Sequence, residues 1–143
     1  KAQDQKVNRR NIILVRINSQ DQLLAADEPM DVSQLKDKIK LFLTNPGDDP
    51  TLPEKVETQI EGLGTAMVSK GVISLQNDRG TSYQAYIAVQ NELVKAINEL
   101  RDEFSLARFG KKYAKLDEDT QKMVRDAIPQ NIPEADPKDV KKK

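Results

Sequence analysis

The chain has 143 residues, the usual length of one domain and enough to bury roughly two-thirds of its unfolded surface. Hydrophobic residues make up 37% of it and charged residues 32%, so we expect a modest core beneath a heavily charged surface. Cysteine is absent, which excludes disulfides and thiolate metal sites. Basic and acidic residues balance at 23 each, which disfavours binding to nucleic acid.

Catalysis is also disfavoured by composition. Histidine and cysteine, the usual acid–base and nucleophilic groups near neutral pH, are both absent. The acidic run 117–119 could contact a cation, but its side chains would point in different directions at a helix start, which favours capping. We therefore expect no catalytic residue, cofactor or metal, and a small-molecule enzyme is the least favoured interpretation.

Both ends of the sequence are basic. Residues 1–10 carry four basic side chains and one acidic side chain, and residues 138–143 carry four lysines and one aspartate. We expect a flexible basic linker at 1–10, one folded domain at 11–136 and a disordered lysine-rich tail at 137–143. The alternative for these ends is an arm lying near an anionic membrane surface.

No apolar run approaches the roughly 20 residues that cross a bilayer. The sequence begins without methionine, which suggests a processed or truncated product.

The first elements in chain order are two strands. Asn11–Asn18 alternates apolar residues on one face, and Ile12 and Leu14 predict partial burial of the other face as well. A polar turn then leads to a second strand at Gln22–Ala26, so the two form a hairpin.

A helix should follow the hairpin. Asp31 and Gln34 have the spacing of a capping box, although Ser33 is an alternative cap. Apolar residues then recur at helical spacing, at Val32, Leu35, Ile39 and Phe42. The lysines of this segment fall largely off that face and should be solvated; they are Lys36, Lys38 and Lys40.

The middle and the end of the chain are less regular. Residues 45–53 form a loop rich in proline, and the spacing of Val56 and Ile60 predicts a short helix at Glu54–Glu61. Beyond residue 104 we expect a frayed helix with a turn at Gly110, and then a helix that Asp117 caps and that ends near Ala127. Gln130–Ala135 would be a last strand, confined to a sheet edge by Pro133.

The clearest secondary-structure pattern in the sequence predicts a strand at 72–75, a turn at 77–80 and a long amphipathic helix. Its predicted apolar stripe is Tyr83, Tyr86, Leu93, Ile97, Leu100 and Phe104. Gln90 occupies the place in that stripe where an apolar residue is expected. Together these elements predict an α/β (α+β) two-layer sandwich, in which two main helices cover one face of a small mixed sheet. Insertions should add further helices to this body.

The turn carries the most distinctive polar cluster. Asn77, Asp78 and Arg79, beside Tyr83, are the candidate partner-binding residues. The alternative is structural, with Asp78 satisfying turn amides and Arg79 in solvent. Gln90 is either a residue at the edge of the helix face, in contact with water, or a polar residue that fixes the register of a helix–helix contact between two copies.

The same unit carries a family resemblance, through the run VISLQNDRGTSYQAYIAVQNEL. It resembles the second half of the soluble domain of ExbD/TolR-type biopolymer transport proteins. The first half of that domain is similar to the run IILVRINSQDQLLAADEPMDVSQLKDKIKLFL. The resemblance covers 11–43, 71–104 and 130–136, and the chain departs from the family by extra sequence at about 44–70 and 105–128.

The resemblance implies a periplasmic domain anchored to the inner membrane by an N-terminal helix that is not in this sequence. Two copies would associate with a channel protein of the ExbB or TolQ kind. Proton flow through that channel would move these domains, which bind a TonB- or TolA-like protein and so support transport at the outer membrane. The alternative is a free-standing periplasmic adaptor for a peptide or cell-wall ligand, because an open sheet edge captures extended peptides.

Overall fold

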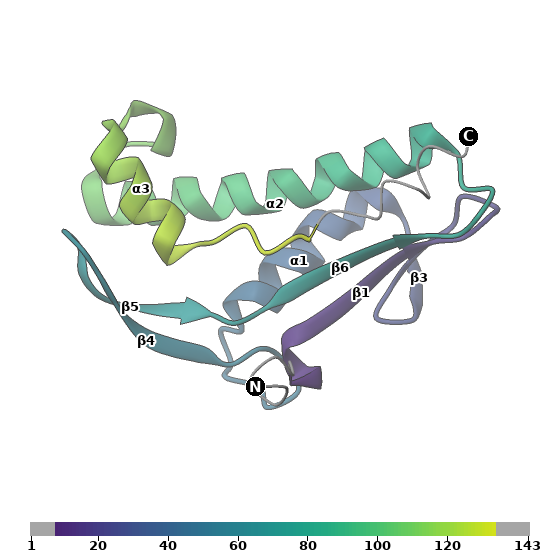
Figure 1. Ribbon diagram of the computed structural model, residues 1–143, viewed down its shortest axis with the longest axis horizontal. Coiled ribbons are helices and arrows are strands. Elements are labelled where there is room, and N and C mark those ends of the chain that lie inside the picture. Colours follow the sequence, from purple (N-terminus) through teal and green to yellow (C-terminus); the bar gives the residue numbers. More distant parts are fainter. Residues whose placement is uncertain (1–7, 134–143) are drawn as a thin grey trace.

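A computed structural model describes residues 8–133 and shows two layers (Figure 1). One layer is a four-stranded sheet in the order β3-β2-β1-β6. Its strands are β1 (Ile12–Ile17), β2 (Leu23–Ala25), β3 (Glu28–Met30) and β6 (Val72–Asn77). The other layer holds α1 (Leu35–Thr44) and α2 (Tyr83–Phe109) on one face of that sheet. The predicted fold class is confirmed.

The centre of the sheet joins the two halves of the chain. β1 pairs in parallel with β6, with Ile13 opposite Ile73 and Val15 opposite Leu75. β1 pairs antiparallel with β2, and β2 pairs antiparallel with β3, so the sheet is mixed. Alternate residues of β1 are buried under the helices, whereas Ile12 is 40% exposed. On the second face Leu14 is half-buried, so the predicted partial burial holds there, but it was wrong at Ile12.

The capping box that opens the first helix is confirmed. Asp31 accepts a hydrogen bond from the Ser33 N–H (3.0 Å), and Gln34 accepts one from the Asp31 N–H (3.2 Å). The first turn, Val32–Gln34, is a 3-10 turn, and α1 continues from it. Leu35, Ile39 and Phe42 are all buried, as the spacing predicted.

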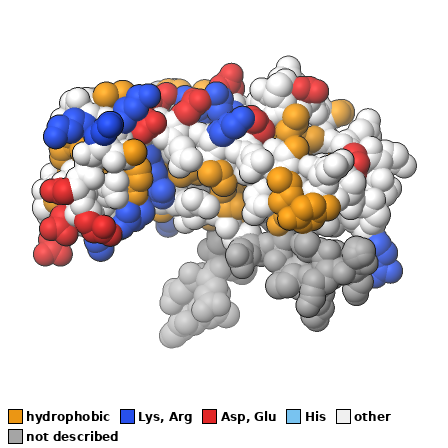
Figure 2. Space-filling view, turned by 90° about the horizontal axis from the view of Figure 1, so that it is seen from above, with side chains coloured by type: hydrophobic (Ala, Val, Ile, Leu, Met, Phe, Trp, Pro, Cys, Tyr) orange, Lys and Arg blue, Asp and Glu red, His pale blue; other side chains and the backbone are white. Residues whose placement is uncertain are grey.

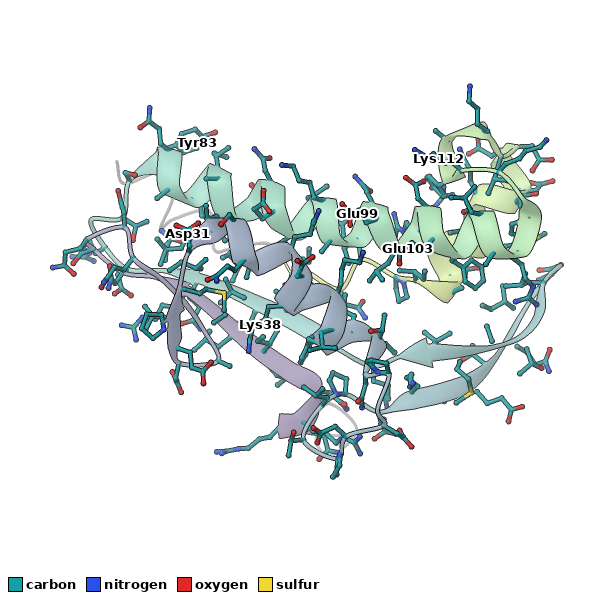
Figure 3. The ribbon with its side chains drawn as sticks, turned by 180° about the vertical axis from the view of Figure 1, so that it is seen from behind. Asp31, Lys38, Tyr83, Glu99, Glu103 and Lys112 are labelled. Atoms are coloured by element: carbon teal, nitrogen blue, oxygen red, sulfur yellow. The ribbon has the colours of Figure 1, made fainter. Side chains whose placement is uncertain are left out.

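Two of the three lysines of α1 were assigned wrongly to a purely solvated surface. The Lys36 Nζ lies 2.6 Å from a carboxylate oxygen of Glu99, and the Lys40 Nζ lies 3.0 Å from Glu99 and 2.7 Å from Glu103. Figure 3 shows both glutamates on the side of α2 that faces α1, with Lys38 on the other side of α1. Sequence spacing on one helix cannot reveal such a pairing, because the partners lie on another helix.

The segment predicted as a short helix at 54–61 is instead a strand. β4 (Lys55–Ile60) and β5 (Gly64–Ser69) form an antiparallel hairpin outside the main sheet. Ile60 and Ala66 are buried against Ala127 at the end of α3 (Glu118–Ala127). This packing decides the structure, because the same residues fit a helix by spacing and a strand by alternation.

The structure of the long helix corrects two predictions, its end and part of its apolar stripe. α2 runs unbroken to Phe109, and Gly110 ends it in the left-handed conformation at φ 75°. Tyr83, predicted in the apolar stripe, is 67% exposed. The core position near Gln90 belongs to Val89, which is 3% exposed, while Gln90 itself is half-buried.

The end of the described chain lies beside β6 without forming a strand there. Asp117 caps α3 as predicted, accepting a hydrogen bond from the Thr120 N–H at 2.8 Å. Beyond α3, the Ile73 N–H donates to the Asn131 carbonyl at 2.9 Å. No strand forms at 130–133, so that prediction was wrong over these residues, and 134–135 lie outside the described chain.

The start of the described chain is held against the 49–53 loop. Residues 9–11 form a 3-10 turn, and the Arg10 Nε donates to the Leu52 carbonyl at 2.7 Å. Within 8–133, no helix combines the length and apolarity that a membrane span requires. The remainder of the predicted linker and the whole predicted tail lie outside the described residues.

Gly71, just before β6, offers a test of the core. A Cβ atom there would lie 2.8 Å from Leu43 and 2.9 Å from Phe42, which are both buried. Gly71→Ala should therefore lower the free energy of unfolding by about 1–3 kcal/mol, measured by urea denaturation. Gly47→Ala is the matched control, because nothing lies within 4 Å of its Cβ position and its effect should stay within about 0.5 kcal/mol. Equal effects at the two glycines would contradict this packing.

Candidate partner-binding surface

One end of the domain is formed by two adjacent turns. The β1–β2 turn (residues 18–22) and the β6–α2 turn (residues 78–82) are joined by hydrogen bonds, and we call this region the turn end. The Asp78 N–H donates to the Ile17 carbonyl at 2.9 Å. The Thr81 hydroxyl lies 2.9 Å from the Ile17 carbonyl and 3.0 Å from the Asn18 carbonyl. The turn end is therefore braced onto the last residue of β1.

Asp78 has a different role from the one expected. Its carboxylate does not accept hydrogen bonds from turn amides in the described chain. It instead accepts two from Arg16 on β1, from Nε at 3.0 Å and from Nη2 at 3.2 Å. This bidentate hydrogen bonding raises the pKa of the Arg16 guanidinium further above its ordinary value. Asp78 thus holds the two central strands together at the turn end.

A second acidic side chain fixes the start of α2. Asp21, from the other turn, accepts a hydrogen bond from the Ser82 N–H at 2.8 Å. Ser82 is the N-cap of α2, and its hydroxyl oxygen accepts from the Ala85 N–H at 3.1 Å. Hydrogen bonds from the Ser82 N–H and hydroxyl lower the pKa of Asp21. The first turn of α2 is consequently tied to the β1–β2 turn.

Two of the predicted partner-binding residues remain exposed on this braced frame. Arg79 is exposed, and Tyr83 lies at the start of α2 with its side chain pointing away from the body (Figure 3). Asn77, the last residue of β6, is half-buried, and Gly80 supplies a left-handed φ of 95°. Tyrosine and arginine are enriched where proteins bind one another, because each combines a broad contact area with polar groups.

Beside these residues lies a pocket that the sequence did not reveal. It has a volume of about 530 Å³ and is lined by Asp21, Pro29, Met30, Asp31, Ala85 and Val89, among others. The pocket brings together β3, the cap of α1 and the start of α2. β3 was not expected as a strand, so no sequence signal could place these residues around one hollow.

Gln90 lies apart from the turn end but on the same side of α2. It follows Tyr83 by two helical turns, so the two side chains leave the helix in nearly the same direction. Figure 2, seen from the α2 side, shows basic and acidic side chains interspersed over this face.

Within the described residues no group of three or more acidic side chains is arranged to hold a metal ion.

The comparison with known families agrees with this architecture. The family model described as "Biopolymer transport protein ExbD/TolR" matches residues 1–101. The match covers both strands of the central pair and most of α2, and the chain belongs to the ExbD/TolR family of biopolymer transport proteins. Residues 102–143, which include α3, lie beyond the matched part. No curated protein matches the sequence significantly.

The bracing of the turn end predicts a specific acid sensitivity. The pKa of Asp21 is below the ordinary 3.8, so its contribution to stability is present above that pH and is lost as the pH falls through the folded-state value. Asp21→Asn retains an acceptor for the Ser82 N–H but removes the titration. The variant should therefore lose less stability than the wild type when denaturation is compared at neutral pH and below pH 3.8.

Asp48→Asn is the matched control for this measurement. Asp48 is an exposed aspartate in the 45–53 loop, away from the turn end, and its carboxylate accepts no hydrogen bond in the described chain. That variant should keep the acid sensitivity of the wild type. A pH dependence unchanged by Asp21→Asn would show that Asp21 does not brace the turn end.

Proposed function

We propose that this chain is the periplasmic domain of an accessory subunit in an energy-transducing complex driven by the proton-motive force. The complex would be of the ExbB–ExbD–TonB or TolQ–TolR–TolA type. The subunit is anchored to the inner membrane by a helix preceding this sequence, and it couples proton flow to transport or integrity at the outer membrane. The domain is not an enzyme and acts by binding a TonB- or TolA-like partner.

The observation that carries this proposal is the placement of the exposed residues relative to the start of the domain. β1 begins next to the first described residues and ends at the turn end, so the two regions lie at opposite ends of one strand (Figure 1). Arg16–Asp78 and the Thr81 hydroxyl tie the turn end directly to that strand. A pull applied through the linker would therefore reach Arg79 and Tyr83 through β1.

The balanced surface charge is compatible with this role. The face seen in Figure 2 carries both signs of charge, so it offers no large patch of one charge to a partner. Recognition would therefore depend on a few specific side chains. Arg79 suits an acidic partner residue, and the ring of Tyr83 suits an apolar one beside it. We propose that Asn77 and Asp78 support this surface from beneath, Asp78 through its pairing with Arg16.

In the complete complex we propose two copies of the chain in contact through α2. Gln90 is half-buried and lies outside the core, and it would pair with its counterpart in the second copy. Sedimentation equilibrium of wild-type and Gln90→Ala protein at high concentration tests this contact. Association should weaken in the variant, and identical association constants would exclude Gln90 from it.

The partner surface is tested by two substitutions in the full-length protein assembled in its complex. Tyr83→Ala and Arg79→Glu should each weaken binding of the TonB- or TolA-like protein by about tenfold, since each truncates or reverses a central contact. Binding is measured by titrating the purified complex with the labelled partner. Neither change should alter the unfolding free energy by more than about 0.5 kcal/mol, because both side chains are exposed.

Lys111→Glu and Asn98→Ala are the matched controls, since both residues are exposed and lie along or beyond α2, away from the turn end. They should leave partner binding unchanged. Equal loss at control and turn-end positions, or no loss at either, would contradict the assignment of this surface.

A further inference from the structure

A groove lies at the opposite end of the domain from the turn end. It has a volume of about 310 Å³ and runs between β5, the C-terminal half of α2 and the end of α3. Leu100, Phe104 and Ile128 form apolar walls, and Met67 and Ser69 on β5 form one side. Met67 is 60% exposed, so the apolar lining of the groove is partly open to solvent there.

The side formed by β5 is a strand edge with free hydrogen-bonding groups. The Lys70 N–H donates to the Glu54 carbonyl at 3.0 Å, which fixes the phase of the antiparallel ladder between β4 and β5. Because bonded and non-bonded pairs alternate, the Glu57–Met67 and Lys55–Ser69 pairs are non-bonded. The N–H and C=O groups of Met67 and Ser69 therefore point away from β4, and no described residue is hydrogen-bonded to them.

The outer edge of β6, the next strand along the chain, already carries an added segment. The Asn131 side chain donates to the Gly71 carbonyl at 3.2 Å, and the Ile73 N–H donates to the Asn131 carbonyl. Asn131 also lines the groove, together with Ile128 and Pro129, so the groove lies directly beside this added segment. The edge of β5 is geometrically ready to pair with extended backbone at Met67 and Ser69.

The charge of the groove narrows the choice of occupant. Lys55 is the one charged residue in its lining, and its ammonium group donates to the Asn45 carbonyl at 3.1 Å but has no carboxylate partner among residues 8–133. The Asn45 carbonyl lies just past the C-terminus of α1 and engages one of three ammonium donors. An acidic group on a ligand would complement the other two.

We propose that this groove binds an extended, acidic–apolar peptide segment of a partner protein. The peptide backbone pairs with the outer edge of β5, one apolar side chain enters between Met67 and Phe104, and an adjacent carboxylate meets Lys55. This mode of recognition joins main-chain hydrogen bonds for affinity with a pocket for side-chain specificity. The site is separate from the turn end and does not depend on the function proposed above.

The test uses the purified chain and a pool of fluorescent peptides of about eight residues, the length of a strand. The pool combines leucine or phenylalanine with threonine and glutamate. Saturable binding is expected for members with an apolar residue beside a glutamate, and replacing that glutamate by glutamine should weaken it by about threefold. No saturable binding anywhere in the pool, or preference for lysine-containing analogues, would overturn the proposal.

Proline substitutions on the two edges of the hairpin provide the matched comparison. Met67→Pro removes an outward N–H without disturbing the β4–β5 ladder, and should weaken peptide binding by about tenfold or more. Glu57→Pro makes the same change directly across the hairpin on the outer edge of β4, and should leave binding within about twofold. Equal affinities in the two variants would overturn strand pairing at β5.

Two measurements keep the result independent of protein folding. Peptides N-methylated on the backbone groups that would face β5 should fail to bind the wild-type chain, and unimpaired binding would overturn the proposal. Sedimentation of the chain alone identifies self-pairing. A dimer abolished by Met67→Pro but not by Glu57→Pro would make a second copy the occupant, and that result also overturns the peptide proposal.

Discussion

The parallel pairing of β1 with β6 is the constraint on which the rest of the domain depends. It brings together the hairpin–α1 half and the strand–α2 half, and it sets Ile13, Val15, Ile73 and Leu75 under the same pair of helices. A slip of one residue would turn these side chains to the outer face and expose them. The register is fixed at one end by Arg16–Asp78 and Thr81, and the same groups create the rigid turn end.

Rigidity at the turn end and openness at the hairpin give the domain two different surfaces. Arg79 lies in a turn that is hydrogen-bonded to a central strand, and Tyr83 begins the helix that follows this turn, so both are held close to β1. β4 and β5 instead form a two-stranded hairpin supported mainly by Ala127 and its neighbours, and their outer edges have no strand partner in the described chain. The hairpin, together with the end of α3, therefore carries the second proposed site.

Much of the core could be predicted because local signals and tertiary packing agree there. The Asp31 capping box, the Asp117 cap and the apolar spacing of α1 each appear in the structure where the sequence placed them. The helix predicted at 54–61 was wrong because the spacing of Val56 and Ile60 fits both a helix and a strand. Packing against Ala127, far along the chain, selects the strand β4. The alternation of apolar residues at 56 and 60 with the glycine turn at 62–64 was the available signal.

The candidate site could be predicted only in part, and for a physical reason. The composition of residues 77–80 predicts a turn, but what each of its side chains does depends on residues from β1. Asp78 is committed to Arg16, a partner that no spacing within the turn suggests. The pocket beside Asp21 and the edge of β5 depend on strands that sequence reasoning did not assign.

Photo-crosslinking from position 83 of the full-length protein in its native membrane tests the central claim most directly. We expect a crosslink to a TonB- or TolA-like protein whose yield changes when the proton gradient is collapsed. A crosslink yield that is insensitive to the gradient, or the absence of any such partner, would contradict the account of this domain as a force-transmitting part.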